Sequence, residues 1–390
     1  MEKKGPPAFS FSGFASVDFM NVEKEAMEME ARRKSLRRIC FAFILACCFM
    51  EGNLESAPAA ELRKIKFATL AGTTQPIFFV AQDKGFLAEE GIDVDIENVT
   101  SGTSMIIEIV AAGQIDIGVC APGVTMLAIE KGVPIKMAGA FEYQFIDKQG
   151  RSWDGSVLVC EDSDSLKKLE DLKGKKIAVS DIGGIYNVYL RNALRKRGMD
   201  PDKDVSILPI PYTSMHSALV KKQVDVAFML PPMYAMAKKD TPLKILMEGT
   251  KVSDIGVDLT AGIGVNEKFA KKNPEIVVKF IKALIRSEFF IVKDIKETNG
   301  EYVKNSVQKR MKYKPEFLEA WYTHRGSYGR EWDFVNPLQI PSSLIPKLSE
   351  MFVSEKLLKK PLTPEKVIDN SFLKKAYAEL GMKWDDKKGQ

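Results

Sequence analysis

The sequence predicts an α/β protein of two similar lobes, each with a mainly parallel sheet. Two observations carry this prediction. The stretch TSGTSMIIEIVAAGQIDIGVCAPG, residues 100–123, is echoed at residues 212–232 by YTSMHSALVKKQVDVAFMLPP. Each contains Thr-Ser-Met, an amphipathic run, and Gln-Ile/Val-Asp-Ile/Val opening an apolar strand. Short strands also alternate with helices of about ten residues throughout both halves, which favours βαβ units.

The first lobe is predicted over residues 61–150. Its expected strands are IKFATLAG, DVDIENV, DIGVCA and PIKMAGAF. Its expected helices are QPIFFVAQDKGFLAEEG, SMIIEIVAAG and GVTMLAIEKG. The first of these helices should end at Gly91, because glycine readily adopts the left-handed conformation that closes a helix.

The second lobe is predicted over residues 151–255 with the same order of elements. Its expected strands are DLKGKKIAVSD, DVSILPI, DVAFML and LKILMEG, and its expected helices are IYNVYLRNALRKRG, SMHSALVKK and PPMYAMAKK. The alternative is a chance recurrence of α/β periodicity. The chain should cross between the lobes near residues 141–157 and again near 249–264.

Residues 256–390 should return to the first lobe and end in helices. The expected helices are NPEIVVKFIKALIRSEFFIVKDI, PEFLEAWYTHRG, PSSLIPKLSEMFVSEKLLK and DNSFLKKAYAELG. Pro274 stands near the start of the first of them, where a missing N–H costs little. These helices should pack on the first lobe, because the chain leaves the second lobe after LKILMEG.

The N-terminal segment has the pattern of a secretory signal. RRKSLRR precedes the twelve-residue apolar run ICFAFILACCFM, and SAPAAE follows. Such a run is too short to span a bilayer, which takes about 20 residues. We expect an exported protein, cleaved after Ala59 or Ala60, so that residues 1–60 are removed. The alternative is a lipoprotein anchored at Cys47, and Met27 or Met29 is the expected start.

Composition excludes several classes of protein. Of the 390 residues 45% are hydrophobic and 28% charged, with a formal net charge of +5. No dense basic block with interleaved aromatic residues indicates nucleic-acid binding. Beyond the signal, Cys120 and Cys160 lie in apolar strand-like runs, so two buried thiols are expected rather than a disulfide framework.

The sequence offers no catalytic constellation. The two histidines, His216 and His324, lack metal-ligand spacing to Cys, Asp or Glu. Neither a GxSxG nucleophile elbow nor a GxxxxGK[ST] phosphate loop occurs. We therefore expect a protein that is not an enzyme and uses no cofactor or metal.

The loops that follow the strands indicate binding instead. In open α/β sheets, ligands bind at the carboxyl ends of strands, near helix N-termini that favour anions. These loops, AGTTQP, TSGTSM, CAPG, SDIGGIYN, IPYTSM and LPPMY, are rich in Gly, Ser and Thr. Any one of them can instead serve only as a helix cap or turn. Six such loops in two facing lobes favour a cleft.

The candidate ligand-binding residues belong to these loops. The polar and backbone contacts are expected from Thr73, Thr74, Gln75, Ser101, Gly102, Thr103, Ser104, Ala121, Pro122, Ser180, Asp181, Gly183, Gly184, Thr213 and Pro231. Aromatic rings that can sandwich a flat ligand are Tyr143, Tyr186, Tyr212 and Tyr234. Glu142 and Asp181 can accept an ammonium group or a hydroxyl.

The motifs together resemble a known family. TTQPIFFVAQDKGFLAEEGIDVDI, SGTS with AAGQIDIGV, DLKGKKIAVSDIGGIYN and QVDVAFMLPP are similar to the periplasmic substrate-binding proteins of the nitrate/sulfonate/taurine and thiamine-pyrimidine group. The resemblance covers residues 65–260, and DNSFLKKAYAELG resembles that family's closing helix. It implies a type II periplasmic-binding fold and ligand contacts at the loops already chosen.

The resemblance also implies a role in an ABC importer. Such a protein captures a small molecule by hinge closure, is expected to be a monomer, and docks on permease and ATPase partners. One departure matters: the cleft loops contain no Arg or Lys. An oxyanion ligand is therefore not favoured over a carboxylate, amide or heteroaromatic one.

Two other functions stay open. The fungal thiamine-pyrimidine synthase of this superfamily is an enzyme with a cysteine-rich CCCFC motif, and the similar text here, Cys47-Cys48-Phe49, falls inside the predicted signal. A ligand-sensing partner protein is the third class.

Overall fold

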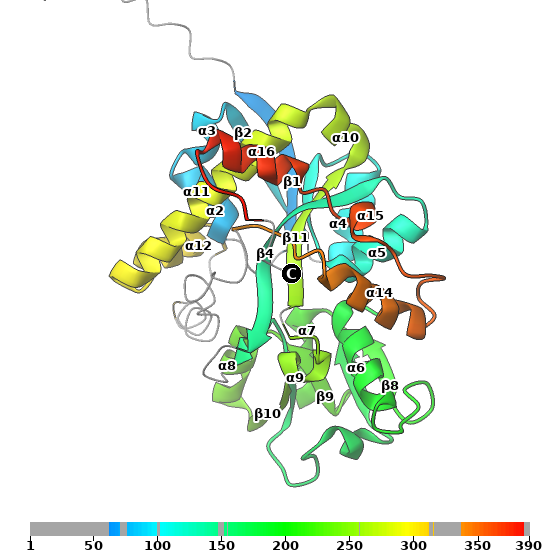
Figure 1. Cartoon of the computed structure of the whole chain (residues 1–390). Coiled ribbons are helices and arrows are strands. Elements are labelled where there is room, and N and C mark those ends of the chain that lie inside the picture. Colours follow the sequence, from blue (N-terminus) through cyan, green and yellow to red (C-terminus); the bar gives the residue numbers. More distant parts are fainter. Residues whose placement is uncertain are drawn as a thin grey trace, which may run out of the picture. The chain divides into compact units, whose positions relative to one another are not determined.

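The computed structural model describes residues 62–70, 76–99, 102–146, 152–153, 155–256, 258–311, 315 and 337–385. The chain divides into two compact units, Met1–Ala60 and Glu61–Gln390, and the described residues all belong to the second (Figure 1). The predicted signal lies outside the described residues, as does the helix expected at PEFLEAWYTHRG, apart from Pro315.

The second unit contains two sheets, as the repeated pattern predicts. The six-stranded sheet has the order β2 (Ile92–Val99), β1 (Arg63–Leu70), β3 (Ile117–Cys120), β11 (Asp258–Asn266), β4 (Ile135–Ile146), β5 (Ser152–Trp153). The five-stranded sheet has the order β10 (Leu243–Glu248), β6 (Val157–Glu161), β9 (Val226–Met229), β7 (Lys176–Val179), β8 (Ser206–Pro209).

Each sheet is mixed, so the prediction of mainly parallel sheets was wrong in this detail. Strands β1, β2 and β3 pair in parallel, as do β7, β8 and β9. The antiparallel pairs are made by the strands next to the crossings: β11 pairs with β3 and β4, and β6 pairs with β9 and β10. A strand that returns from the other lobe has no crossover helix and so enters in the opposite direction.

Helices cover both sheets. In the first lobe they are α2 (Pro76–Asp83), α3 (Phe86–Glu89), α4 (Thr103–Ala111), α5 (Pro122–Glu130) and α10 (Glu267–Lys272). In the second they are η1 (Leu169–Leu172), α6 (Ile185–Arg195), α7 (Tyr212–Val220), α8 (Pro231–Asp240) and α9 (Gly249–Ser253). The helix predicted up to Gly91 is broken into α2 and α3, because Gly85 adopts a left-handed φ of 74°.

The strands at the crossings are longer than predicted. β4 continues to Ile146 rather than ending near Phe141, and the segment expected to be a connection near residues 249–264 forms α9 and most of β11. β4 and β11 are paired along their length, from Ile135 opposite Asn266 to Gln144 opposite Asp258. Figure 1 shows these two strands running from the upper lobe towards the lower one.

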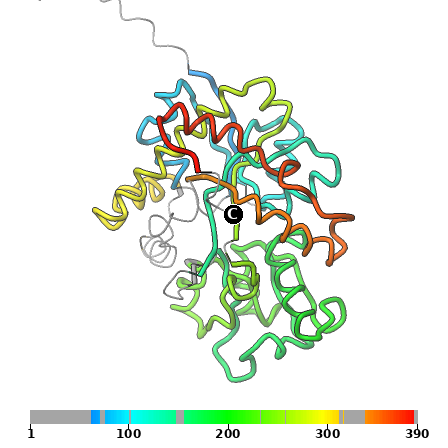
Figure 2. Tube along the Cα trace, in the orientation of Figure 1, coloured from blue at the N-terminus to red at the C-terminus, as the bar shows by residue number. Residues whose placement is uncertain are grey.

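The C-terminal helices are α11 (Pro274–Thr298), α12 (Glu301–Met311), α14 (Leu344–Ser354), α15 (Pro364–Val367) and α16 (Ser371–Glu379). As predicted, α11 packs on α2 and α16 packs on β4, both in the first lobe. Helix α14 differs, because it contacts α5 of the first lobe and α6 of the second. The orange segment in Figure 2 runs beside both lobes.

An ion-pair cluster fixes this contact between the lobes. Glu355, just after α14, has a fully buried side chain. It accepts hydrogen bonds from Arg191 Nε at 2.6 Å and from Arg195 Nε at 2.9 Å, both on α6. Asp202 accepts hydrogen bonds from the Nη2 atoms of both arginines. The C-terminal segment therefore holds the second lobe as well as the first.

The cores are apolar and close-packed. In the first lobe the rings of Phe67 and Phe78 lie 4.2 Å apart between centroids, and Phe280 of α11 packs on Phe67 at 5.4 Å. Cys120 and Cys160 are buried and free, which confirms the prediction of two thiols. Among the described residues, no helix combines the length and apolar character that crossing a bilayer needs.

Candidate functional site

Four helices begin at one cavity between the lobes. α4 and α5 bring their N-termini from the first lobe, and α6 and α7 bring theirs from the second. The residues that precede them, Gly102, Ala121, Gly184 and Pro211, all line this cavity of about 510 Å³. The four helices follow β2, β3, β7 and β8, so the cavity lies at the carboxyl ends of these strands, and Leu70 at the end of β1 also lines it.

These four helix N-termini carry no side-chain cap within the described residues. Glycine, alanine and proline stand where serine, threonine, asparagine or aspartate would normally accept hydrogen bonds from the first amides. The N-cap side chain therefore satisfies none of the first-turn backbone N–H groups of these helices, whose N-termini also carry about half a positive charge from the helix dipole. At these four loops the N-cap residue itself does not cap the helix through its side chain.

The structure brings many of the predicted residues to this cavity. Those that line it are Gly102, Thr103, Ala121, Ser180, Asp181, Gly184, Tyr186, Tyr212 and Thr213. The two Thr-Ser-Met turns therefore face the same space, from opposite lobes. Thr73, Thr74, Gln75 and Ser101 lie outside the described residues.

The structure does not bring the other predicted residues to the lining. Glu142 and Tyr143 were assigned to a loop, but β4 continues through both. Tyr143 is buried, and its hydroxyl donates to the Gln339 carbonyl. Tyr234 lies inside α8, where it packs in the core of the second lobe, and Pro231 is the first residue of that helix.

Ser104, Pro122 and Gly183 are neighbours in sequence of lining residues but do not line the cavity themselves. The hydroxyl of Ser104 donates to the Asp181 carboxyl from the opposite lobe. Pro122 is buried at the first position of α5, where it has no N–H to offer. A Cβ on Gly183 would lie 2.8 Å from Leu127 Cδ1 of α5, so this glycine allows the lobes to approach closely.

Asp181 is the one formally charged side chain among the described residues that line the cavity. It faces the first lobe across a short gap: a Cβ added to Gly102 would lie 3.1 Å from Asp181 Oδ2. Gly102 also has a φ of 89°, so both space and backbone conformation require glycine there. Burial raises the pKa of the Asp181 carboxyl, and hydrogen bonds from the Ser104 and Ser180 hydroxyls offset part of that rise.

Tyr186 is tied to the strands that join the lobes. Its hydroxyl donates to Gln144 Oε1 at 3.0 Å, and Gln144 Nε2 donates to Asp258 Oδ2 at 2.8 Å. The Gly155 backbone N–H also donates to Gln144 Oε1, at 3.3 Å. Since a backbone N–H can only donate, this contact sets the orientation of the Gln144 amide. The chain of bonds links the cavity wall on α6 to β4 and β11.

Asp258 ends this chain in a fully buried position. It also accepts a hydrogen bond from the Tyr189 hydroxyl at 2.5 Å, while its Oδ1 atom has no partner among the described residues. Burial raises the pKa of Asp258 to about 7, although the hydrogen bonds from Tyr189 and Gln144 act in the opposite direction. A carboxyl at the crossing between the lobes is therefore protonated below neutral pH.

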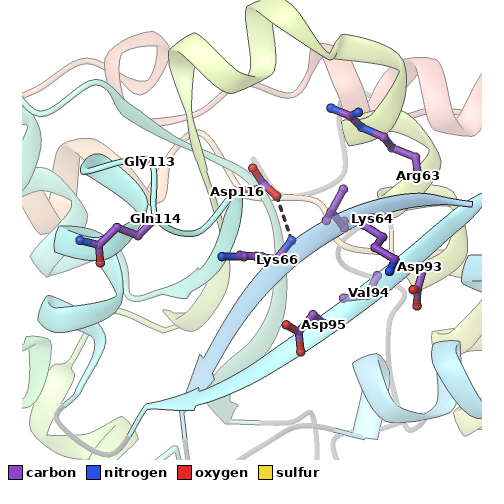
Figure 3. A pocket seen from close by; sticks show the side chains of 10 residues that line it. Arg63, Lys64, Lys66, Asp93, Val94, Asp95, Gly113, Gln114 and Asp116 are labelled. Carbon is purple, nitrogen blue, oxygen red and sulfur yellow. Dashed lines mark hydrogen bonds between the residues drawn. The ribbon is translucent and has the colours of Figure 1, made fainter.

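A second hollow, of about 690 Å³, lies elsewhere on the first lobe. Figure 3 shows it between the exposed side chains of β1 and β2 and the turn before β3, where the Lys66 backbone N–H donates to Asp116 Oδ2 at 2.8 Å. It is the larger of the two, but it lies at the amino ends of these strands and after the C-terminal end of α4. It thus lacks the helix N-termini that the cavity between the lobes collects, and we assign the site to the latter.

Sequence reasoning missed part of the lining. These residues are Leu70, Ile185, Pro209, Pro211, Ser214 and Thr260. Ile185, Pro211 and Ser214 lie inside the predicted loops SDIGGIYN and IPYTSM without being named as candidate contacts, and Leu70 and Pro209 immediately precede the loops AGTTQP and IPYTSM. Thr260 gave no such signal, because it belongs to β11, whose segment was interpreted as a connection; its hydroxyl donates to the Glu142 carbonyl at 3.2 Å.

The described residues contain no cluster of His, Cys, Asp and Glu with the geometry of a metal site. His216 contacts the Thr241 hydroxyl at 2.9 Å in the second lobe, apart from the cavity lining, and His324 lies outside the described residues.

Comparison with known proteins identifies the family and the fold. A family model described as "NMT1/THI5 like" matches residues 74–297, more than half of the chain. A protein of Brucella abortus (strain 2308) with a provisional binding-protein name is 29% identical over 337 residues, which cover 84% of this chain and 96% of the relative. A 4-amino-5-hydroxymethyl-2-methylpyrimidine phosphate synthase of Saccharomyces cerevisiae is 25% identical over 241 residues, 58% of this chain and 65% of the enzyme.

Among solved structures, the periplasmic nitrate-binding protein NrtA from Synechocystis PCC 6803 matches with a TM-score of 0.64 and 15% identity, covering 82% of this chain and 89% of NrtA. This likeness confirms the type II periplasmic-binding fold. Together with the family model, it also confirms the resemblance that the sequence motifs carried. The chain belongs to the NMT1/THI5-like family.

Proposed function

We propose that this protein is the exported solute-binding component of an ABC importer and holds a small organic molecule in the cavity between its lobes. The observation that carries the proposal is the meeting of four helix N-termini without side-chain caps at one cavity of about 510 Å³. Their amides offer hydrogen bonds to a ligand that spans both lobes. The name of the Brucella relative supports binding as the activity.

We further propose that the chain is divided into functional parts at the boundaries expected from the sequence. Residues 1–60 direct export and are removed or lipid-anchored, 61–150 and 256–390 form the first lobe, and 151–255 form the second. The predicted ligand contacts of the undescribed loops, Thr73 to Gln75 and Ser101, belong to the same proposed site. The working form is a monomer that docks on permease and ATPase subunits.

The mechanism that fits this arrangement is closure about the crossings. A ligand that touches Thr103 on α4 and Thr213 on α7 stabilises the conformation in which both lobes reach it. The paired strands β4 and β11 connect the lobes, and the Tyr186–Gln144 bond ties the cavity wall to them. Occupancy of the cavity is thereby linked to the position of the second lobe.

An enzyme related to the yeast synthase is the second candidate, and the matched lengths favour it less. The Brucella binding protein aligns over 96% of its own length, whereas the yeast enzyme aligns over 65%. The polar side chains of the described lining residues are hydroxyls and one carboxyl, and no histidine or cysteine is among these lining residues.

The test is incubation of the purified protein with a total metabolite extract. We expect the melting temperature to rise while every metabolite is recovered unchanged by mass spectrometry. Consumption of a metabolite would show that the protein is an enzyme and would contradict the proposed receptor function. If extracts from several growth conditions leave the melting temperature unchanged, the proposed binding function is contradicted.

A further inference from the structure

The charge pattern of the cavity indicates which class of ligand it accepts. We propose that the cavity selects neutral or zwitterionic organic molecules that carry an N–H or ammonium donor, and that Asp181 is the residue that binds this donor. The inference rests on the proposed binding function and narrows it to a class of compound. It favours such molecules over simple oxyanions such as nitrate and over sulfonates without an amino group.

The first step is the balance of charge. Among the described lining residues, Asp181 alone is of a formally charged type, and the remaining polar side chains are hydroxyls of serine, threonine and tyrosine. A ligand with a net negative charge would therefore meet a carboxylate and no side-chain cation at these positions.

The second step is the position of Asp181. Its carboxyl lies beside Gly102 of the opposite lobe and accepts hydrogen bonds from the Ser104 and Ser180 hydroxyls. An ionised carboxylate has about four acceptor positions on its two oxygens. Two hydroxyl donors therefore leave room for a donor from the ligand. Because the group also lines the cavity, an N–H of the ligand can reach it without a change of fold.

The third step is the opposite polarity of the rest of the wall. The N-termini of α4, α5, α6 and α7 present N–H donors and partial positive charge to the same space. They match acceptor atoms such as a carboxylate, a carbonyl or a ring nitrogen. A ligand that satisfies both sets of groups carries acceptors at one end and a donor at the other, which is the pattern of a zwitterion or of a neutral nitrogen compound.

The fourth step is size and shape. Tyr186 and Tyr212 place aromatic surface in the lining, and Leu70, Ile185, Pro209 and Pro211 add apolar surface. A nitrate ion would leave most of a cavity of about 510 Å³ to water. An organic skeleton that packs on the rings fits this lining better, since ligand sites combine apolar walls with a few polar groups.

The experiment uses the full-length protein and a metabolite extract separated on ion exchangers. The three probes are the cationic fraction, the neutral and zwitterionic fraction, and the anionic fraction. Binding is measured as the shift in melting temperature over a dilution series of each fraction. The variants are Asp181→Asn, which keeps the shape but loses the charge, and Asp164→Asn as the matched control. Asp164 is also in the second lobe, but its side chain is 98% exposed and pairs with Lys167.

We expect the neutral and zwitterionic fraction to stabilise the wild type and Asp164→Asn equally, and Asp181→Asn to need at least tenfold more of it. Stabilisation by the anionic fraction, equal in wild type and Asp181→Asn, would overturn the ligand class but leave the binding function. Stabilisation by no fraction would overturn the binding function itself. If Asp181→Asn fails to fold without ligand, Asp181→Ser is the second variant, and the same comparison applies to it.

Discussion

Helices α4 and α7 begin with the same Thr-Ser-Met tripeptide but use it differently. Thr103 is the first residue of α4, whereas α7 begins one residue earlier, at Tyr212, so that Thr213 is its second. One residue is a rotation of about 100° around a helix. Met105 is 40% exposed, while Met215 is fully buried in the core of the second lobe.

This difference shows what an internal repeat can and cannot predict. The repeat correctly gives the order of elements and brings both threonines to one cavity. It does not give the helical register, because the register depends on where each helix starts. Gly102, with a φ of 89°, precedes α4, whereas Pro211, with a φ of −54°, precedes α7.

The largest expected effect comes from the two methionines. Met215→Ala should lower the free energy of unfolding by about 2–5 kcal/mol, because it leaves a cavity in a buried core. Met105→Ala should change it by less than about 0.5 kcal/mol, because the side chain is partly exposed. Guanidinium unfolding of both variants measures the difference. Equal losses would mean that the two helices share one register.

The next effect concerns the contact of α14 with the second lobe. Glu355→Ala should cost about 2 kcal/mol, because it leaves Arg191 and Arg195 without their buried partner while solvent screens the more exposed arginine. Glu350→Ala, on the exposed face of α14, is the control and should be close to neutral. Chemical unfolding at low and high salt checks this pair, and identical stabilities would show that the C-terminal segment does not hold the second lobe.

Two buried carboxyl groups, Asp258 and Glu288, should make the stability of the protein depend on pH. Asp258 lies where the lobes join and accepts hydrogen bonds from two side chains. Glu288 lies in α11 of the first lobe, and neither of its carboxyl oxygens has a partner among the described residues. Burial raises the pKa of Asp258 to about 7 and that of Glu288 to about 8.

The sign of the pH effect follows from these shifts. Both pKa values are higher in the folded protein than in the unfolded chain, where they stand near 4. Each group therefore stabilises the fold fully below pH of about 4, and this contribution is lost as the pH rises to about 7 for Asp258 and about 8 for Glu288. The free energy of unfolding should depend less on pH in each variant than in the wild type: between about pH 4 and 7 for Asp258→Asn, and between about pH 4 and 8 for Glu288→Gln. Plots of unfolding free energy against pH that run parallel to that of the wild type would contradict the raised pKa values of these two carboxyls.

The smallest expected effects are on binding. Thr103→Ala, Thr213→Ala and Gln75→Ala should each weaken the stabilisation by the neutral and zwitterionic fraction about three- to tenfold, which corresponds to about one hydrogen bond. Tyr186→Ala should weaken it at least as much, since it removes a ring from the lining. The melting temperatures of the ligand-free threonine and glutamine variants should barely change. Unchanged binding in all four variants would contradict the assignment of the ligand site to the cavity between the lobes.

Much of the fold was predictable because its elements carry local signals. The strands and helices of both lobes follow apolar periodicity bounded by Gly and Pro. The length of β4 was not predictable from Phe141 onwards, because Glu142 to Gln144 owe their strand conformation to pairing with β11. That long-range pairing explains why Glu142 and Tyr143 were assigned to a loop.

The lining of the cavity was predictable to the same degree. Loop residues such as Thr103, Asp181 and Tyr212 line it because strand ends meet at one edge of each sheet. The bonds that hold Tyr186 were not found, since Gln144 and Asp258 lie far apart in sequence and become neighbours only through the pairing of the crossing strands.

Hydrogen–deuterium exchange of the full-length protein tests most directly whether both lobes hold one ligand. The neutral and zwitterionic metabolite fraction should slow exchange at the starts of α4, α6 and α7 together, in residues 102–107, 184–189 and 211–216. The hollow of Figure 3, at residues 63–66 and 113–116, should exchange as before. Protection confined to one lobe, or found at the hollow of Figure 3 instead, would contradict a shared cavity between two lobes.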